Sequence, residues 1–518
     1  MNKKIILIFI ILISLFSLLF ISINNYIGEN GNKIFIYKKV SNYLPLNFKT
    51  FLKSKIFVYK QNEILNEKIK FLQHENANLK NLASHQNFEF KFNSDLKIKD
   101  NFFVKIFINP YLKILSPKTY ISFYDDNLFI ITGEGTIQHS NIKNFIDINN
   151  KSIFFNNINS NLKFLFLENS ALDFGKLDLW EKQVVKDILI HDDKIFISYV
   201  KKVKANDKRP ILALPDGYDS SPEEEKIRDE LLKQNNNCYV NAIAVGDLNL
   251  KNIKFSDFLV FNECFADLAY SQTGGNLSFF KDNKILMSVG DWRSLERIGF
   301  TKNYPQDMNS YLGKILSIDL NNKNIKIISL GHRNPQGMYY DQKKDILYMT
   351  EHGPQGGDEV NINISPGKEL RNYGWAISSY GEYDDIYSDN FSDEEINEKK
   401  KIGPLYKNHK DYGFVEPVIY FSPLSIGISE IVEANNFFKN TFNDQNLFFG
   451  SLGYDDVGRD SWSIHYLKLE KNQKILDRQV YKINERIRDL KKFNIEGEDI
   501  IFMTLENGSI GIAKSKKF

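Results

Sequence analysis

The 518-residue sequence carries little net charge and few cysteines. Its formal net charge is +2 at pH 7, whereas a protein that binds nucleic acid needs a strongly basic face. The composition therefore gives no support for nucleic-acid binding. Cys238 and Cys264 are the only cysteines. In an exported protein such a pair favours a disulfide, and two buried thiols are the alternative.

Charged residues are also missing from an apolar run between residue 5 and about residue 23. A run of about 19 residues is long enough to span a bilayer. Two lysines precede it and predict that this end stays in the cytoplasm. A cleaved signal peptide is the alternative, but no small-x-small cleavage site follows Ser22. We therefore predict a single-pass anchor at residues 1–25 in the inner (cytoplasmic) membrane, with the remainder in the periplasm or outside.

A heptad pattern follows the anchor, within a membrane-proximal helical segment that we predict at residues 26–100. Val58, Leu65, Leu72 and Leu79 lie seven residues apart. This spacing predicts a coiled coil that makes the protein a homo-oligomer through a helix at residues 55–83. The alternative is an amphipathic helix that lies on the membrane or on the surface of the following domain.

One phrase recurs six times between residue 101 and the C-terminus: a turn with Asp or Asn, a short apolar strand, and a small or polar end. The copies occupy residues 125–134, 192–198, 282–291, 345–350, 444–451 and 498–504. Blades of four strands take about 40 to 50 residues each, so six copies with polar insertions fit a six-bladed β-propeller. We therefore predict an all-β fold at residues 101–518, with the repeated strand innermost and its polar end facing one common mouth.

Polar residues with useful chemistry gather on the loops between residues 331 and 375. Arg333 and Asn334 place a planar donor fork beside an amide, which suits a carboxylate or a quinone oxygen. Gly353 and Pro354 precede Asp358 and Glu359 in a glycine-rich loop. Backbone carbonyls and carboxylates of this kind are calcium ligands, although many such loops are solvated turns.

Arg486 and Arg488 form a second candidate site for an anion. The two arginines lie two residues apart on a predicted strand, so they face the same side. A pair of like charges on one face needs an anionic ligand or a carboxylate partner. Pairing with the neighbouring Glu485 or Asp489 is the alternative.

Three motifs together resemble the glucose/sorbosone dehydrogenase family. They read GHRNPQG at 331–337, E-x-GP-x-x-x-DE at 351–359 and NYGW at 372–375. Shorter matches are GGNL at 274–277, SVGD at 288–291, YLGKIL at 311–316 and RIRD at 486–489. The resemblance runs from about residue 102 to the C-terminus. It implies a six-bladed propeller that uses pyrroloquinoline quinone to oxidise a sugar or a related aldehyde or alcohol.

The resemblance also implies roles for single residues. Arg333, Asn334, Arg486 and Arg488 would hold the carboxylates and oxygens of the quinone. Hydride would pass from the sugar to the quinone while a base removes the hydroxyl proton. The cofactor supplies the hard chemistry in such an enzyme, and the protein orients it.

Calcium is the second cofactor that the resemblance implies. The carbonyls of Gly353 and Pro354 would bind a calcium ion that polarises the quinone. Glu359, the carbonyl of Tyr373 and Glu416 would bind a second, structural calcium.

The sequence departs from the family at the catalytic base. Gln272 stands where the family has a histidine before the Gly-Gly turn, and glutamine accepts no proton at neutral pH. General-base catalysis contributes roughly 10²- to 10⁴-fold. Asp291 is the nearest carboxylate, and His332 and His352 lie on neighbouring loops, so these three are candidate replacements. Gly453 also replaces an expected quinone-binding lysine.

Two functions follow from these residues. The first is a membrane-anchored, exported quinoprotein-like dehydrogenase. The alternative is a catalytically inactive, calcium-stabilised propeller that binds a glycan or a protein partner. Binding of the quinone separates the two, because an inactive propeller has no reason to hold it.

Overall fold

The computed structural model describes residues 87–99, 101–109, 112, 118–147, 149–166, 183–204, 209–211, 237–265, 272–293, 302–354, 356–381, 393–438, 445–453 and 460–517. The chain divides into two compact units, Met1–Gln86 and Asn87–Phe518. No helix within these described ranges is long and apolar enough to cross a membrane. The predicted anchor at 1–25 and the predicted helix at 55–83 lie outside the described residues, so both stay predictions.

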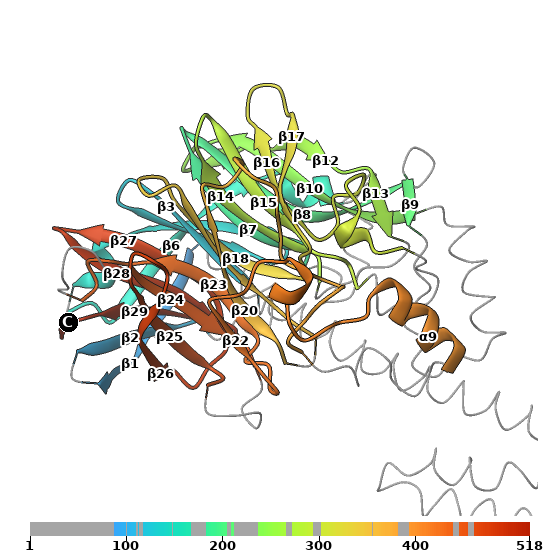
Figure 1. Ribbon diagram of the computed structural model, residues 1–518. Helices are drawn as coiled ribbons and strands as arrows, with labels where there is room; N and C mark the ends of the chain where they lie inside the picture. Colours follow the sequence, from blue (N-terminus) through green and yellow to red (C-terminus); the bar gives the residue numbers. More distant parts are fainter. Residues whose placement is uncertain are drawn as a thin grey trace, which may run out of the picture. The chain divides into compact units, whose positions relative to one another are not determined.

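The second unit consists mostly of β-strands arranged in antiparallel meanders (Figure 1). The described strands form six groups of four, in this order: β3 (Thr119–Tyr124), β4 (Asn127–Thr132), β5 (Ile137–Asn141) and β6 (Ser152–Ser160); β7 (Val185–His191), β8 (Lys194–Lys204), β10 (Asn237–Asp247) and β12 (Ser256–Val260); β14 (Gly274–Phe280), β15 (Lys284–Val289), β16 (Lys314–Asp319) and β17 (Ile325–Leu330); β18 (Pro335–Asp341), β19 (Ile346–Glu351), β20 (Asp358–Ile364) and β22 (Ile419–Phe421); β23 (Ile428–Glu433), β24 (Gln445–Ser451), β25 (Ser463–Leu469) and β26 (Ile475–Lys482); β27 (Ile487–Ile495), β28 (Glu498–Leu505), β29 (Ser509–Lys514) and β2 (Phe102–Ile108).

Ten further described elements lie outside these six groups. They are β1 (Asn87–Lys99), β9 (Arg209–Ile211), β11 (Asn252–Ile253), β13 (Glu263–Phe265), β21 (Arg371–Asn372), the α-helices α5 (Lys143–Ile146), α6 (Leu162–Phe166) and α9 (Asp393–Ile402), and the 3₁₀ helices η2 (Tyr304–Gln306) and η3 (Lys410–Tyr412). Helix is thus a minor component of the described chain, as an all-β fold requires.

The first strands of the six meanders form a closed ring. Each contacts the next in the order β3, β7, β14, β18, β23, β27 and back to β3. The N-terminal strand β2 pairs with β29 near the C-terminus and thereby supplies the fourth strand of the last meander. Strand β1 pairs with both β2 and β6, so it joins the last meander to the first. This arrangement is consistent with a propeller, in which ring closure leaves few free sheet edges.

The six repeated phrases form the second strand of each meander, namely β4, β8, β15, β19, β24 and β28. The prediction that they are innermost is therefore wrong, because β3, β7, β14, β18, β23 and β27 contact one another around the ring. A second strand is covered on both faces and reads as a continuous apolar run. Strand β24, for example, is buried at every residue. Since first and second strands are antiparallel, the starts of the former lie beside the ends of the latter.

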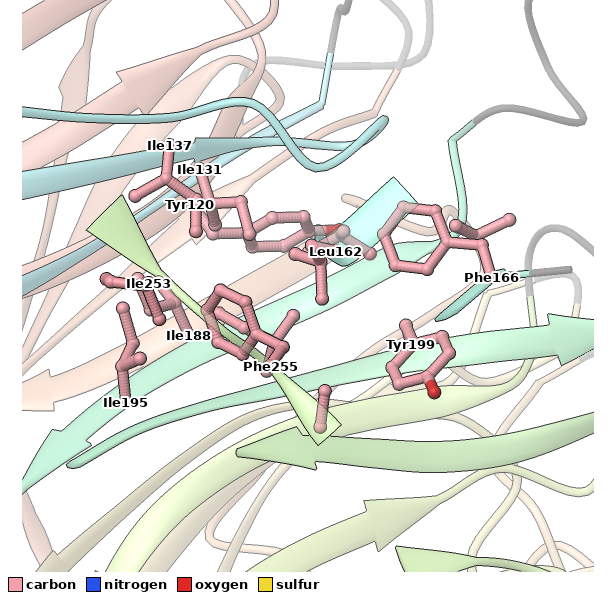
Figure 2. Packing of buried hydrophobic residues seen from close by; sticks show 14 of the residues in the cluster. Tyr120, Ile131, Ile137, Leu162, Phe166, Ile188, Ile195, Tyr199, Ile253 and Phe255 are labelled. Carbon is pink, nitrogen blue, oxygen red and sulfur yellow. The ribbon is translucent and has the colours of Figure 1, made fainter. Parts of the chain in front are cut away.

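Apolar side chains fill the space between neighbouring meanders. Figure 2 shows this packing between the first and the second meander, where Tyr120 and Ile131 face Ile188 and Tyr199 across a cluster that includes Phe166. Burial of apolar surface contributes roughly 25 cal/mol per Å², so such interfaces fix the meanders against one another. Loops at the strand ends consequently stand on a rigid scaffold.

The β unit begins earlier than the predicted boundary at residue 101. Residues 87–99, predicted within the helical segment, form β1. Phe88, Phe90 and Phe92 alternate with polar residues there, which is the period of a strand. The heptad pattern ends before this alternation starts.

The two cysteines lie on neighbouring strands. Cys238 belongs to β10 and Cys264 to β13, and Tyr239 stands opposite Phe265 in this pair of strands. Both cysteine side chains lie outside those that the structure describes, so the disulfide stays a prediction.

Candidate active site

The first strands of the ring start at one end of the β unit, which we call the start end. The residues at or just before these starts are Lys118 for β3, Lys186 for β7, Gln272 for β14, Arg333 and Asn334 for β18, and Arg486 and Arg488 for β27. Five of the seven are sequence-predicted site residues. The fold therefore gathers candidates that are more than 200 positions apart in the chain, because Gln272 and Arg488 belong to the same end.

Arg333 bridges two loops at the start end. Its Nη1 donates to the carbonyl oxygen of Gly353 at 2.5 Å, and its Nη2 donates to the side-chain oxygen of Gln272 at 2.7 Å. The guanidinium also lies over the ring of Trp375, with 5.4 Å between Cζ and the ring centroid, a distance at which cation–π attraction operates. These three contacts fix the plane of the donor fork, which is the geometry that recognition of a quinone oxygen needs.

Asp291 connects Gln272 and Trp375 within this site. It is fully buried; its Oδ2 accepts from the indole Nε1 of Trp375 at 2.7 Å. Its Oδ1 accepts from the backbone N–H of Arg293 at 2.9 Å and from the side-chain amide of Gln272 at 3.2 Å. The structure thus places the predicted catalytic residue beside Gln272 and the indole under Arg333. Both its oxygens already accept from protein donors, which suits a positioning residue better than a base.

Asn334 ties the loop before β18 to the Gly-Gly turn. Its Oδ1 accepts from the backbone N–H of Gly274 at 3.3 Å and from Nε2 of Gln336 at 2.9 Å. Gly274 and Gly275 have φ values of 60° and 108°, a region that glycine enters without steric cost. The turn therefore delivers Gln272 toward Arg333 only with glycine at these positions.

The two histidines proposed as replacement bases have different environments. His332 is fully buried, and its ring nitrogens contact Glu351 Oε2 at 2.7 Å and Ser329 Oγ at 2.8 Å. His352 donates from Nε2 to the carbonyl oxygen of Ile428 at 2.5 Å, so its Nδ1 is the unprotonated nitrogen of the neutral ring. Burial, and then Arg333 and Arg488 nearby, lower the pKa of His352. Both ring nitrogens of His332 therefore contact protein side chains, whereas the hydrogen bond of His352 to Ile428 involves Nε2 alone.

Arg486 and Arg488 share one carboxylate that sequence reasoning missed. Nε of Arg486 donates to Oε2 of Glu506 at 2.5 Å, and Nη2 of Arg488 donates to Oε1 of the same residue. Burial would raise the pKa of Glu506, but the two guanidinium groups outweigh it and hold that pKa below its usual value. The shared carboxylate is thus neither Glu485 nor Asp489, which are the alternative partners suggested by the sequence. Glu506 follows β28, beside the start of β27, and no local motif marks it.

The first predicted calcium loop is organised by hydrogen bonds. Asp358 accepts at Oδ1 from the N–H of Gly353 at 3.1 Å, and at Oδ2 from Ser425 Oγ at 2.7 Å. The carbonyl of Gly353 accepts from Arg333, while Pro354 is buried. Among the described side chains, no group of three or more His, Cys, Asp or Glu is arranged to hold a metal. The predicted ligands are backbone carbonyls rather than side chains, so this calcium site stays a prediction.

A histidine, His409, contacts a residue of the second predicted calcium site. Oε1 of Glu359 lies 3.1 Å from Nε2 of His409, and Oε2 accepts from Asn361 Nδ2 at 2.9 Å. Burial raises the pKa of Glu359. It lowers that of His409, but Glu359 outweighs burial there and the net direction is upward. Exposed Glu416 instead accepts from the hydroxyl of Tyr380 at 2.5 Å. Both Glu359 and Glu416 raise the pKa of His409, so the two predicted ligands lie near the same imidazole.

Tyr373 is the third residue of the second predicted calcium site. The hydroxyl of Tyr373 donates to the carbonyl of Ile362 at 3.0 Å. The ring of His409 packs directly on Gly374, where any side chain would collide with it. An imidazole thus lies beside the Tyr373–Gly374 peptide and bonds to Glu359. The second calcium site stays a prediction.

Gly453 leaves no room for the lysine that the family pattern would place there. A Cβ at this position would lie 2.6 Å from Ser461 Oγ and 2.7 Å from the carbonyl oxygen of Ile426. The indole Nε1 of Trp462 donates to the carbonyl of Gly453. Nζ of Lys482 donates to the carbonyl oxygen of Ser461 at 2.8 Å, so another lysine lies near this position.

Comparison with known proteins agrees with the motifs. A family model described as Glucose / Sorbosone dehydrogenase matches residues 229–511. Aldose sugar dehydrogenase YliI of Escherichia coli (strain K12) is 29% identical over 266 residues, which cover 48% of this chain and 62% of that protein. Quinoprotein glucose dehydrogenase B of Acinetobacter calcoaceticus is 32% identical over 124 residues, 20% of this chain and 25% of that protein.

Two further proteins are similar to this chain. An uncharacterized protein of Synechocystis sp., slr1608, is 28% identical over 253 residues, 46% of this chain and 54% of that protein. The matches thus span from a quarter to about three-fifths of these relatives. A crystal structure of glucose dehydrogenase has a TM-score of 0.49 at 17% identity, covering 78% of this chain and 97% of that chain. Because the family model covers more than half of the 518 residues, the chain belongs to the glucose/sorbosone dehydrogenase family.

Proposed function

We propose that the protein is a membrane-anchored, exported six-bladed propeller that oxidises a sugar, or a related aldehyde or alcohol, with pyrroloquinoline quinone. The observation that carries this proposal is the position of Arg333. Its donor fork is fixed between Gln272 and Gly353, over Trp375, at the same end of the ring as Arg486 and Arg488. Family membership supports the reaction class, and the relatives' names supply the substrate class.

The charge at the start end suits the quinone's carboxylates. Arg486 and Arg488 both contact the carboxylate of Glu506. Nε of Arg488 is buried and has no hydrogen-bond partner within the described part of the chain. A buried donor without an acceptor costs roughly 1–3 kcal/mol, and a ligand carboxylate would remove this cost. When bound, the quinone supplies the two-electron acceptor for hydride transfer.

We assign His352 as the base that accepts the hydroxyl proton of the substrate. It lies on the loop whose carbonyl Gly353 contacts Arg333, and its side chain remains partly exposed. Its Nδ1 faces away from the Ile428 hydrogen bond and is therefore an acceptor. Asp291 positions Gln272 and Trp375, as its contacts show. The low pKa of His352 makes it a weak base, so we expect slow turnover.

Gln272→His should raise turnover. A histidine at this position would stand beside Asp291 and Arg333 and add a proton acceptor, and general-base catalysis contributes roughly 10²-fold or more. We expect kcat for sugar-dependent dye reduction to rise at least about tenfold while KM changes little. Gln272→Asn, which adds no base, is the matched control. If the histidine variant were no faster than the asparagine variant, a missing base would not limit the reaction.

The activity itself is tested with the full chain in detergent. The purified protein is incubated with pyrroloquinoline quinone, with and without calcium, and a panel of aldoses is added with an electron-accepting dye. The proposal predicts sugar-dependent reduction that needs the quinone. A chelator arm shows whether calcium is required. If no sugar gave quinone-dependent dye reduction, a non-catalytic binding propeller would be favoured.

A further inference from the structure

We infer that Tyr380 and Tyr420 form a platform on which a sugar ring stacks, and that the ligand of the candidate active site is therefore an oligosaccharide. We call this pair of side chains the tyrosine platform. The inference rests on the proposed function and deepens it, because it names the class of sugar. Both tyrosines lie outside the three central motifs of the sequence.

The two rings of the tyrosine platform are stacked. Their centroids lie 3.9 Å apart, and the ring planes differ by 7°. Tyr380 is half-buried, and the ring of His409 packs against it edge to face at 4.9 Å between centroids. Tyr420 belongs to β22 and is 47% exposed. The platform thus has an inner ring that the protein supports and an outer ring that is open to solvent.

Hydrogen bonds fix the inner ring before any ligand binds. The hydroxyl of Tyr380 donates to Oε2 of Glu416 at 2.5 Å. Oε1 of Glu416 accepts from the backbone N–H of Lys410 at 2.6 Å, which holds the carboxylate in place. A side chain that is already ordered loses little conformational entropy on binding. The tyrosine platform is therefore preorganised for a ligand.

The inner ring lies beside the loop that contacts Arg333. Gly381 follows Tyr380 in the chain, and a Cβ at Gly381 would collide with Cγ of Pro354. The backbone after the tyrosine therefore packs directly on this proline. The residue before it, Gly353, accepts from Nη1 of Arg333 at 2.5 Å. Contacts thus run without interruption from the tyrosine platform to the donor fork of the candidate active site.

The outer ring is tied to the same loop. Phe421, which follows Tyr420, accepts at its carbonyl oxygen from the N–H of Gly357 at 2.5 Å. Neighbouring strands lie about 4.8 Å apart, so β18 and β22, which are separated by β19 and β20, lie about 14 Å apart. A single sugar at the start of β18 is too short to reach β22. An oligosaccharide can contact Arg333 and the tyrosine platform at once.

A sugar ring has the chemistry that this platform offers. The face of a pyranose carries C–H groups, and the face of an aromatic ring carries the negative lobe of its quadrupole, so the two faces attract each other. The hydroxyls at the rim of the sugar need hydrogen-bond acceptors. Exposed Glu416 lies at the edge of the tyrosine platform, and a carboxylate can accept more bonds than the two it already has. Apolar and polar groups therefore occur side by side, as a glycan requires.

Tyr420→Ala and Tyr420→Phe test the inference in the full chain in detergent. Affinity for glucose, maltotriose and cellotriose is measured by titration calorimetry without quinone. We expect the wild type to bind at least one trisaccharide roughly tenfold or more tightly than glucose, because stacking on an aromatic ring has effects of about this size. Tyr420→Ala should lose this preference, whereas Tyr420→Phe should keep it because the ring remains. Phe154→Ala removes an aromatic side chain on β6 that is 56% exposed, and this control should keep the preference as well.

The comparison of sugars separates binding from structure. A tyrosine with only a structural role would weaken the binding of glucose and of the trisaccharide by the same factor when it is replaced. The tyrosine platform predicts a larger loss for the trisaccharide than for glucose. Melting temperatures of the variants should stay close to that of the wild type, because substitutions at exposed positions have small effects on stability.

The outcomes also separate this inference from the proposed function. Trisaccharides that bind the wild type no more tightly than glucose, or equally well to the wild type and to Tyr420→Ala, would overturn the inference. Such a result, combined with sugar-dependent reduction of the quinone, would leave the proposed function intact. Trisaccharide binding that depends on Tyr420, with no sugar able to reduce the quinone, would sustain the tyrosine platform and contradict the dehydrogenase.

Discussion

Arg333→Met is expected to lower kcat/KM for quinone-dependent sugar oxidation by about 10²- to 10³-fold, the usual effect of removing one preorganised donor from an active site. The guanidinium bridges Gln272 and Gly353 and lies over Trp375. Methionine fills a similar volume but donates no hydrogen bond. Both the loop at 353 and the side chain at 272 would lose the group that orients them.

Arg333→Lys distinguishes charge from geometry. Lysine keeps the positive charge, but a point charge on a flexible stem does not reproduce the planar fork. We expect activity between that of the wild type and that of Arg333→Met, with weaker quinone binding in both variants. Arg371, which belongs to β21 and lies 3.8 Å from Glu369, provides the control Arg371→Met. Activity of Arg333→Met within threefold of the wild type would remove Arg333 from the mechanism.

Lys491→Met should have the largest effect on stability. Nζ of Lys491 lies 2.9 Å from Glu430, 3.5 Å from Asp489 and 3.8 Å from Asp187. These carboxylates come from β23, β27 and β7, which are not all neighbours in the ring. Removing one partner of a buried charge group costs roughly 3–5 kcal/mol. Because the lysine side chain is 22% exposed, we expect about 3 kcal/mol.

The same carboxylates fasten neighbouring first strands. Asp489 accepts from the N–H of Ile121 in β3 at 2.7 Å, and Asp187 accepts from Leu277 N–H in β14 at 2.8 Å. Glu430 accepts from the N–H of a β18 residue, Met338, at 3.1 Å. Their charge is therefore part of the ring's construction. Without Lys491 the three carboxylates would repel one another, although each would still accept its hydrogen bond from a backbone N–H.

The pH dependence of Lys491→Met follows from Glu430. Burial raises the pKa of Glu430 to about 7, although Lys491 opposes the shift. Removing Lys491 would therefore raise the pKa of Glu430 further. A raised folded-state pKa means that the folded state binds more protons, and stability falls as pH rises through it. The deficit of Lys491→Met against wild type should therefore be larger at pH 8 than at pH 5. Urea unfolding at both pH values measures this, with Lys326→Met as control; equal deficits would contradict the account.

The contiguous motifs made part of the site predictable from sequence. Arg333, Asn334 and Gly353 lie within 21 positions of one another, so a short pattern contains them all, and the structure brings them together. The six repeated phrases also marked six strands correctly. Their place in the meander was misjudged because buried second strands are uniformly apolar, whereas first strands mix apolar residues with groups such as Lys186.

Other parts could not be read from the sequence because they depend on strand neighbours. Glu506 meets Arg488 only through the pairing of β27 with β28. Lys118 and Lys186 meet only because β3 and β7 are adjacent in the ring. His409 lies 50 positions from Glu359, and no local pattern connects the two. Contacts of this kind follow from ring closure, which involves the whole β unit.

The most direct test of the central claim is the absorbance of bound quinone under anaerobic conditions. The full chain is loaded with pyrroloquinoline quinone, freed of excess cofactor, and mixed with an aldose in the absence of dye. A quinone-dependent sugar dehydrogenase predicts conversion of the oxidised spectrum to the reduced one, with one sugar oxidised per quinone. A retained quinone whose spectrum no aldose, aldehyde or alcohol changes would contradict it.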